Sequence, residues 1–221
     1  MRRAPWILVA LLLAGCSGAP SAATPAPTPA PSALPAGTHT SAAFRPAVTF
    51  TVPAGWWIAA DSADYFALQP VDSAIVGIHL FRDPLAASQD AACPTVPEPG
   101  VGTLALELAT WIRGLPGIIA SSPRMATVGG LRGVELDVAL NAGWTASCPF
   151  ADGVPTVPLF VGANGDLRWV AAGNERLRLS LLDVAGGGTV VVDIDAFDGT
   201  QMEALLAAAT PIVQSFSFAT P

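Results

Sequence analysis

The sequence predicts an α+β fold, a mostly antiparallel β-sheet flanked by helices, and three observations carry this prediction. Short apolar segments alternate with turns that contain Gly and Pro along most of the chain, which is typical of antiparallel strands. Only two segments have apolar residues at helical spacing, and both are short. Hydrophobic residues make up 52% of the 221 residues and charged residues 12%, so the chain can bury a large core. We expect one globular domain over residues 44–221.

The first fifteen residues have the features of a bacterial secretion signal. Arg2 and Arg3 are followed by an apolar run over residues 5–15, which is shorter than the roughly 20 residues that span a bilayer. The run ends in Leu13-Ala14-Gly15-Cys16, which resembles the lipobox of bacterial lipoprotein precursors. The resemblance implies that residues 1–15 are removed and that Cys16 carries a lipid with two acyl chains, enough for stable anchoring. We therefore expect an extracytoplasmic protein that is anchored to the cell membrane through Cys16.

Residues 16–43 are predicted to form a disordered linker behind the lipidated N-terminus. They are almost wholly Ala, Pro, Ser, Thr and Gly, and His39 is their only ionisable side chain. Such a segment buries too little apolar area to offset the entropy of ordering it. Its prolines favour extended polyproline II segments of about 3.1 Å per residue, so it would act as a spacer up to roughly 80 Å long.

The charge balance excludes one class of partner. All ten basic residues are arginines, against seventeen acidic residues, and the formal net charge is −7. Removal of the signal takes away two of these arginines and makes the exported chain more acidic. An acidic surface repels phosphate backbones and anionic lipid headgroups. We expect no nucleic-acid partner, and membrane attachment through the lipid alone.

The domain is expected to contain eleven strands and two helices. Strands are expected over residues 48–52, 65–68, 75–81, 118–120, 125–128, 131–140, 157–161, 167–172, 175–184, 189–196 and 216–218. One helix is expected from about Leu104 to Arg113, with Thr103 as its N-cap. The second is expected to start near Thr200 and to be kinked or restarted at Pro211.

The turns at Gly173-Asn174 and Gly186-Gly187 predict a three-stranded meander and, with it, a candidate ligand face. Centring the second hairpin on Gly186-Gly187 places Arg178 opposite Asp195, and the first turn places Trp169 beside Arg178. An aromatic ring flanked by charges can bind a glycan ring or a peptide. The alternative is that a helix covers this face and that the charges pair with one another. The candidate ligand face consists of Trp169, Arg176, Arg178, Asp193 and Asp195.

Two segments resemble a known family. The segment Phe50-Thr51-Val52-Pro53-Ala54-Gly55-Trp56, the strand–strand–helix–strand order that follows it, and a closing helix that leads into Ser215-Phe216-Ser217-Phe218 are similar to the PsbP-like α/β/α sandwich. The resemblance covers residues 44–221 as topology. It implies an antiparallel sheet flanked by helices and a role as an accessory or binding protein. It carries over no catalytic residues and no cofactor.

The exported domain has two cysteines, Cys93 and Cys148, and export places them in an oxidising compartment. An even pair in such a compartment usually forms a disulfide. A metal site needs more ligands, and His79 is the only histidine after residue 43. We therefore predict a Cys93–Cys148 disulfide and no metal site.

His79 and one acidic segment have both a structural and a chemical interpretation. His79 lies within an apolar strand, where a buried, hydrogen-bonded histidine is expected, with a catalytic base as the alternative. Asp193, Asp195 and Asp198 suggest a calcium loop, but Phe197 stands where a ligand belongs. Asp198 also fits as a negative charge before a helix N-terminus.

These observations lead to one expected function and two alternatives. We expect a non-enzymatic binding or accessory module of the cell envelope, with an envelope protein, a glycan or a lipid as its partner. The first alternative is a scaffold or assembly factor for an envelope complex. The second is an envelope hydrolase, which would need His79 and an acid at an open pocket.

Overall fold

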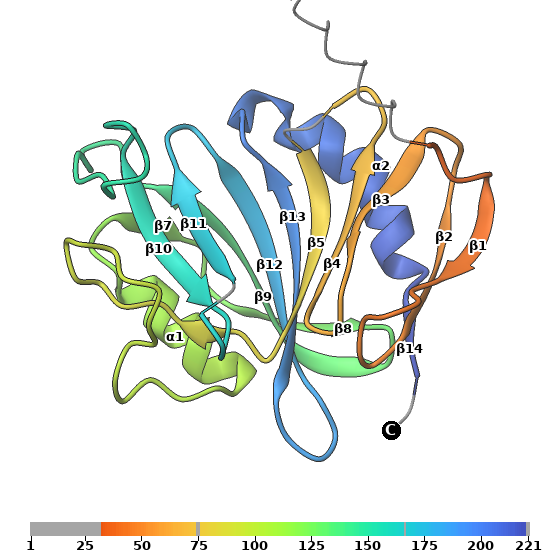
Figure 1. The fold of residues 1–221 in the computed structure, drawn as a ribbon, viewed down its shortest axis with the longest axis horizontal. Helices are drawn as coiled ribbons and strands as arrows, with labels where there is room; N and C mark the ends of the chain where they lie inside the picture. The colour runs from red at the N-terminus through yellow and green to blue at the C-terminus, as the bar shows by residue number, and fades with distance from the viewer. Residues whose placement is uncertain (1–31, 74–75, 166, 220–221) are drawn as a thin grey trace, which may run out of the picture. The chain divides into compact units, whose positions relative to one another are not determined.

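The computed structural model describes residues 32–73, 76–165 and 167–219 (Figure 1). The signal segment, Cys16 and the first part of the linker lie outside the described residues, so those predictions stay predictions. The described residues belong to one compact unit. Within them, no helix is both long enough and apolar enough to cross a membrane.

A large antiparallel sheet forms the centre of the fold. Its strands are β3 (Trp56–Asp61), β4 (Tyr65–Pro70), β5 (Val76–Arg82), β7 (Ile118–Ala120), β8 (Arg124–Val128), β9 (Leu131–Leu140), β12 (Arg176–Asp183) and β13 (Thr189–Ala196). They lie in the order β3-β4-β5-β13-β12-β9-β7, and β8 also pairs with β9. The strand predictions are thereby confirmed for most of this sheet.

Two smaller antiparallel sheets have three strands each. One contains β1 (Gly37–Thr40), β2 (Val48–Val52) and β14 (Ser217–Phe218), and the other contains β6 (Leu85–Ala86), β10 (Thr156–Val161) and β11 (Arg168–Ala172). The strand β1 corrects the linker prediction, because residues 37–40 pair with β2 instead of being disordered. Hydroxyl pairs across the two strands, Thr38 with Thr51 and Thr40 with Thr49, add hydrogen bonds that a count of apolar residues does not register.

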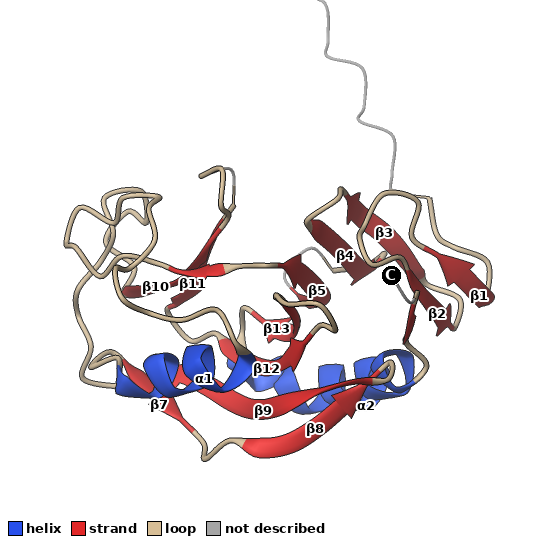
Figure 2. Ribbon diagram, turned by 90° about the horizontal axis from the view of Figure 1, so that it is seen from below, coloured by secondary structure: helices blue, strands red, loops and turns tan. Residues whose placement is uncertain are grey.

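Each face of the large sheet is covered by one helix and one small sheet. On the first face, α1 (Ala105–Gly114) and the β10–β11 pair enclose a core that includes Leu177, Leu179 and Leu181. On the second, α2 (Met202–Gln214) and the β1–β2 pair enclose a core that includes Val192 and Ile194. We call these the α1 face and the α2 face. In Figure 2, α1 lies on the side of β10, and α2 lies on the side of β1 and β2.

The helix-flanked sandwich predicted from the sequence is thus too simple, and the fold is β-rich with two short helices. A helix is about 10 Å wide, whereas strands are spaced about 4.8 Å apart. One helix therefore covers only a few strands of such a wide sheet. The remaining width of each face is covered by the small sheets, whose strands the sequence analysis placed in a single sheet.

The β12–β13 register differs by one residue from the predicted one. Leu179 is opposite Asp193 and Arg178 is opposite Ile194. The hairpin closes between Val184 and Gly188, so its loop has three residues instead of the predicted two. A slip of one residue moves every side chain to the other face of the sheet.

The predicted meander is wrong at its first turn. The strand β11 pairs with β10 and not with β12, whose neighbours are β9 and β13. Gly173-Asn174 connects two different sheets, and Glu175 closes this turn by donating its N–H to the carbonyl of Ala172. As a result, Trp169 lies over the large sheet and not beside Arg178.

Carboxylates accept hydrogen bonds from backbone N–H groups at the start of both helical segments, α1 and the 3₁₀ turn that precedes α2. Leu104, and not the predicted Thr103, is the N-cap of α1, and Asp183 accepts a hydrogen bond from the N–H of Ala105 at 2.9 Å. The second helical segment begins as a short 3₁₀ turn, η1 (Gly199–Gln201), and α2 continues through Pro211. Asp198 accepts from the N–H of Thr200 at 3.0 Å, which confirms its predicted place before the helix.

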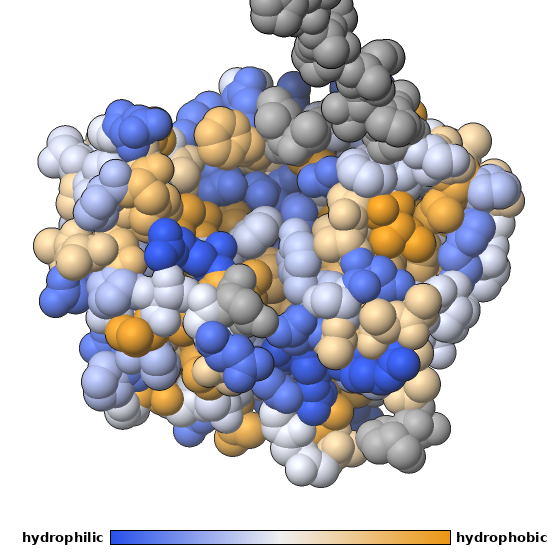
Figure 3. Space-filling model, viewed as in Figure 1, coloured by the Kyte–Doolittle hydropathy of each residue, from blue (hydrophilic) through white to orange (hydrophobic). Residues whose placement is uncertain are grey.

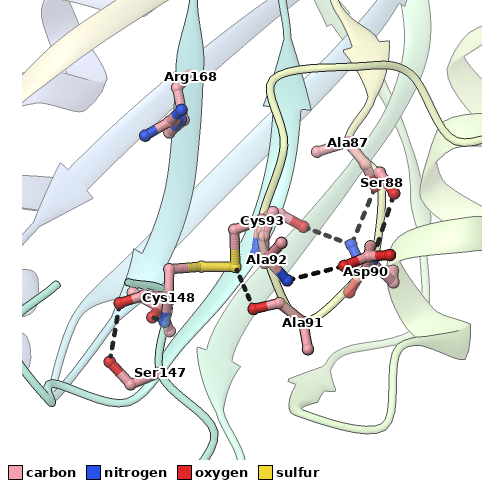
Figure 4. The surroundings of a disulfide bond; sticks show 12 residues. Ala87, Ser88, Asp90, Ala91, Ala92, Cys93, Ser147, Cys148 and Arg168 are labelled. Carbon is pink, nitrogen blue, oxygen red and sulfur yellow. Dashed lines mark hydrogen bonds between the residues drawn. A yellow bond between two sulfur atoms is a disulfide. The ribbon is translucent and has the colours of Figure 1, made fainter. Parts of the chain in front are cut away.

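The Cys93–Cys148 disulfide is present, as predicted (Figure 4). The two Cα atoms are 5.7 Å apart, and the bond closes a segment of 55 residues between the loop after β6 and the loop before β10. Cys148 is buried, and its N–H donates to the hydroxyl of Thr156 at 2.8 Å. The disulfide therefore links the loop that follows β6 to the loop that precedes β10, and both strands belong to the small sheet on the α1 face.

Candidate functional site

A cavity of about 320 Å³ lies on the α1 face, between the large sheet and β11. Figure 3 shows this side of the molecule hollowed near its middle, with hydrophilic residues in the hollow. The strands β4, β5, β11 and β13 supply most of the lining. We call this the Trp169 cavity, and its lining residues are Tyr65, Gln69, Val76, His79, Trp169, Asp195 and Phe197.

Strand alternation and one glycine make room for the cavity. Tyr65 on β4 and His79 on β5 point to the α1 face, where Ala67 lies opposite His79. Gly77 shares that face, and a Cβ atom there would lie only 2.8 Å from Nε2 of His79. Small residues at these two positions let the imidazole lie against the sheet at the edge of the cavity.

Tyr65 and His79 form a hydrogen-bonded pair. The Tyr65 hydroxyl and Nδ1 of His79 share a hydrogen bond of 2.8 Å, and the two rings are stacked with centroids 6.0 Å apart. Burial lowers the pKa of His79 to about 4. Burial, with smaller effects from Asp193 and Asp195, raises the pKa of Tyr65 to about 12. Both side chains are therefore neutral near neutral pH.

Trp169 covers this pair from β11. Its ring centroid lies 4.6 Å from that of His79 and 4.9 Å from that of Phe81. Its indole N–H donates to Oδ2 of Asp193 at 2.8 Å. The indole therefore links the small sheet on the α1 face to the centre of the large sheet.

Three buried carboxyl groups lie next to these aromatic rings. Asp193 is 0% exposed, Asp195 8% and Glu175 6%. Glu175 accepts a hydrogen bond from the N–H of Ala172 at 2.7 Å, and its carboxyl group also bonds to that of Asp195. The Oδ1 atoms of Asp193 and Asp195 are buried without a hydrogen-bond partner among the described residues.

The protonation of this cluster follows from burial. Burial and the charge of Asp195 raise the pKa of Glu175 to about 9, so Glu175 keeps its proton at neutral pH. Burial raises the pKa of Asp195 to about 6 and that of Asp193 well above its ordinary range. The ion pairs found in the described part of the chain involve other acids, so no arginine neutralises these three.

The structure divides the predicted ligand face. Trp169, Asp193 and Asp195 are together on the α1 face, because the one-residue slip moved both aspartates there. Arg176 and Arg178 lie on the α2 face, where they line a separate groove of about 600 Å³ beside α2.

The predicted ion pair changes accordingly. Nε of Arg178 donates to Oδ1 of Asp137 on β9 at 2.7 Å, in place of the predicted partner Asp195. Arg176 is exposed at the start of β12. The two arginines therefore cannot act on the same ligand as the Trp169 cavity.

Five members of the site were not predicted from the sequence, namely Tyr65, Gln69, Val76, Glu175 and Phe197. Tyr65 is the only tyrosine of the chain, and its position at the start of a predicted strand gave no hint of a partner. Glu175 was expected to be the first residue of the strand over residues 175–184, and Phe197 was considered only as a residue that cannot be a calcium ligand. His79 was predicted to be a buried, hydrogen-bonded histidine, which is confirmed, but it also lines the cavity.

The described residues contain no group of three or more His, Cys, Asp or Glu side chains placed to hold a metal ion. The three aspartates of the proposed calcium loop do not converge. Asp193 and Asp195 are buried on the α1 face, whereas Asp198 accepts a hydrogen bond from the backbone N–H of Thr200.

Comparisons with known proteins give only distant structural likenesses. No family model and no curated protein matches the chain. The solution structure of cyanobacterial PsbP (CyanoP) from Synechocystis is similar with a TM-score of 0.41 and 10% identity, over 84% of this chain and 95% of that one. A crystal structure from Bacteroides thetaiotaomicron has a TM-score of 0.36 and 8% identity, over 78% of this chain and 45% of that one. A PsbP-like fold is thus among the similar structures, and nothing about function follows at these values.

Proposed function

We propose that the protein is a membrane-anchored extracytoplasmic lipoprotein and a non-enzymatic binding module of the cell envelope, with the Trp169 cavity as its ligand site. The observation that carries this proposal is the pair of partnerless carboxylate oxygens of Asp193 and Asp195, buried next to an aromatic-lined cavity. The secretion signal and the lipobox that ends in Cys16 support the expected anchoring and location.

The cost of this arrangement supports a functional role. A buried polar group without a partner costs about 1–3 kcal/mol, and such groups are few in native proteins. Groups with strongly shifted pKa values cluster at functional sites. The cluster at the Trp169 cavity has both partnerless buried oxygens and shifted pKa values. The partnerless oxygens belong to Asp193 and Asp195, and the pKa values of Glu175, Asp193 and Asp195 are all raised.

We also propose that the domain is a variant of the PsbP-like sandwich. The supporting observations are internal to this chain. The segment Phe50–Trp56 leads from β2 into β3, α2 leads into β14, and the two helices lie on opposite faces of the large sheet. The small sheets that complete each face would be the departure from a simple three-layer arrangement.

The hydrolase alternative has one observation in its favour. His79 and Asp195 both line the Trp169 cavity, as that alternative requires. Against it, Nδ1 of His79 bonds to Tyr65 instead of an acid, and a pKa of about 4 makes the imidazole a weak base at neutral pH. The described lining residues also include no Ser, Thr or Cys nucleophile.

The proposed function is tested by capture from native envelope extracts. The full-length lipoprotein in detergent is incubated with the extract, and retained small molecules and proteins are identified by mass spectrometry. We expect the same small molecule on the wild type and on the control Phe150→Ala, and its loss from Trp169→Ala. A protein partner that Trp169→Ala retains would favour the scaffold alternative, and turnover that His79→Ala abolishes would favour the hydrolase.

A further inference from the structure

We infer that the Trp169 cavity takes a small organic ammonium ion, with its carbon atoms against the aromatic rings and its positive charge against the carboxyl group of Asp195. This inference rests on the proposed function, because it names the ligand class of the same cavity. Its first support is Asp195, which is 8% exposed, lines the cavity, and has a partnerless Oδ1 atom.

The charges around the cavity favour a cation. Asp195 supplies the negative charge at the cavity wall, because Glu175 beside it keeps its proton at neutral pH, and no arginine of the described residues forms an ion pair with Asp195. The whole chain is also acidic, with a formal net charge of −7. An anionic ligand would be repelled both on approach and in the cavity.

The walls favour an organic cation over a metal ion. Tyr65, Trp169 and Phe197 line the cavity together with the neutral imidazole of His79. Aromatic faces attract ammonium groups through their quadrupole, and the attraction strengthens when water is excluded. A metal ion would need more ligands than this lining offers, since no metal-holding group of His, Cys, Asp and Glu occurs in the described residues.

The volume of the Trp169 cavity limits the size of the ligand. A volume of about 320 Å³ is at the lower end of ordinary small-molecule sites. A peptide or glycan chain would not be enclosed, whereas an alkylammonium ion with a few carbon atoms fits. Phe197 is about half exposed (51%), so one wall of the cavity lies at the protein surface.

Binding of a cation would release protons. The titratable groups around the cavity are Tyr65 and His79 from β4 and β5, Asp193 and Asp195 from β13, and Glu175 from the turn before β12. Tyr65 and His79 are neutral and do not change their protonation state near neutral pH. A nearby positive charge lowers the pKa of carboxyl groups, so Glu175, which holds its proton at neutral pH, would release protons when the ligand enters.

The test compares isosteric ligands by calorimetry on the full-length lipoprotein in detergent. Choline is the charged probe, and dimethylbutanol, in which carbon replaces the nitrogen, is the neutral one. We expect choline to bind at least about tenfold more tightly than dimethylbutanol. We also expect a binding enthalpy that depends on the ionisation enthalpy of the buffer, because protons are released. Tighter binding of choline than of glycerophosphocholine would identify a free ammonium ion as the ligand, and tighter binding of glycerophosphocholine would identify a lipid headgroup.

Two variants keep the test specific. Asp195→Asn removes the charge with little change of shape, and it relieves repulsion in the cluster, so the protein is expected to fold. Asp152→Asn removes a charge from an exposed loop where Asn tolerates the positive φ of 49°. We expect Asp195→Asn to weaken choline binding at least about tenfold and Asp152→Asn to leave it unchanged.

The outcomes that overturn the inference differ from those that overturn the proposed function. Equal binding of choline and dimethylbutanol, or equal affinity of the two variants, overturns the ammonium ligand. If a neutral molecule from the envelope is still lost from Trp169→Ala, the cavity remains the binding site. If no small molecule is captured in a Trp169-dependent way, the proposed function itself fails.

Discussion

The indole N–H of Trp169 donates to Oδ2 of Asp193 at 2.8 Å, and this bond joins two sheets of the fold. Trp169 belongs to β11 of a small sheet, and Asp193 lies in the middle of β13 at the centre of the large one. Asp193 is fully buried and its Oδ1 atom has no partner among the described residues, so its carboxyl group depends on the indole N–H of Trp169 as a donor.

Trp169→Phe should therefore destabilise the protein by more than the loss of ring area alone. The variant keeps an aromatic ring over His79 but leaves Asp193 without its donor, at a cost of about 1–3 kcal/mol in the free energy of unfolding. Chemical denaturation measures this cost. Trp111→Phe on α1 is the control, because Trp111 has no indole hydrogen bond among the described residues. Equal losses in both variants would show that the bond to Asp193 contributes nothing.

Stability should fall as the pH rises from about 6.5 to about 9. The pKa of Glu175 is raised by burial from 4.5 to about 9, so its contribution to stability is complete below 4.5 and is lost as the pH approaches 9. The pKa of His79 is lowered to about 4, so its contribution is complete above about 6.5 and is lost only toward acid. Above that pH the slope therefore comes from the carboxyl cluster.

Glu175→Gln is the variant that isolates this slope. The amide can still donate to Asp195 and accept from the N–H of Ala172, but it does not titrate. Unfolding free energies measured at several pH values should decline less steeply for this variant than for the wild type. Glu203→Gln, an exposed residue of α2, should keep the wild-type slope. Parallel curves for the wild type and Glu175→Gln would contradict the raised pKa of Glu175.

The disulfide should be a major source of stability. In the chain-entropy model, a bond that closes the 55 residues between Cys93 and Cys148 stabilises by about 4 kcal/mol. The double variant Cys93→Ser, Cys148→Ser should lose a large part of this free energy of unfolding, as measured by chemical denaturation without reductant. The wild type in reductant should lose a similar amount. A double variant as stable as the oxidised wild type would contradict a stabilising role.

The two arginines of the predicted ligand face should be dispensable for the Trp169 cavity. Arg178 pairs with Asp137 on the opposite face at 2.7 Å, and both side chains are partly exposed. Exposed pairs of this kind contribute about 0–1 kcal/mol. Arg178→Met should therefore change stability little and leave retention of the captured small molecule unchanged. Loss of that molecule from Arg178→Met would mean that the two faces of the sheet are coupled.

Local signals in the sequence predicted much of the fold. Apolar runs between Gly and Pro turns located most strands, and the place of Asp198 before a helix followed from its charge. The Cys93–Cys148 bond followed from the presence of two cysteines in the exported domain. Each of these predictions depends on residues close in the chain or on simple counting.

The site could not be predicted in the same way because it depends on the exact length of one hairpin loop and on which strand β11 pairs with. Ala185 joins Gly186-Gly187 in the hairpin loop, and the resulting shift of one residue decides which face carries Asp193 and Asp195. The strand β11 leaves the expected meander to pair with β10, which brings Trp169 over His79. Neither event changes the pattern of apolar residues, so strand periodicity could not reveal it.

The last prediction concerns the lipid anchor at Cys16. If Cys16 carries the diacylglyceryl group, Cys16→Ser expressed with its own signal should move from the membrane to the soluble extracytoplasmic fraction and lose labelling by radioactive palmitate. The reason is that a thioether can form only on the thiol, and two acyl chains account for stable attachment. Cys93→Ser should stay in the membrane, because that cysteine belongs to the disulfide and not to the anchor. Palmitate label that remains on Cys16→Ser would contradict an anchor at Cys16.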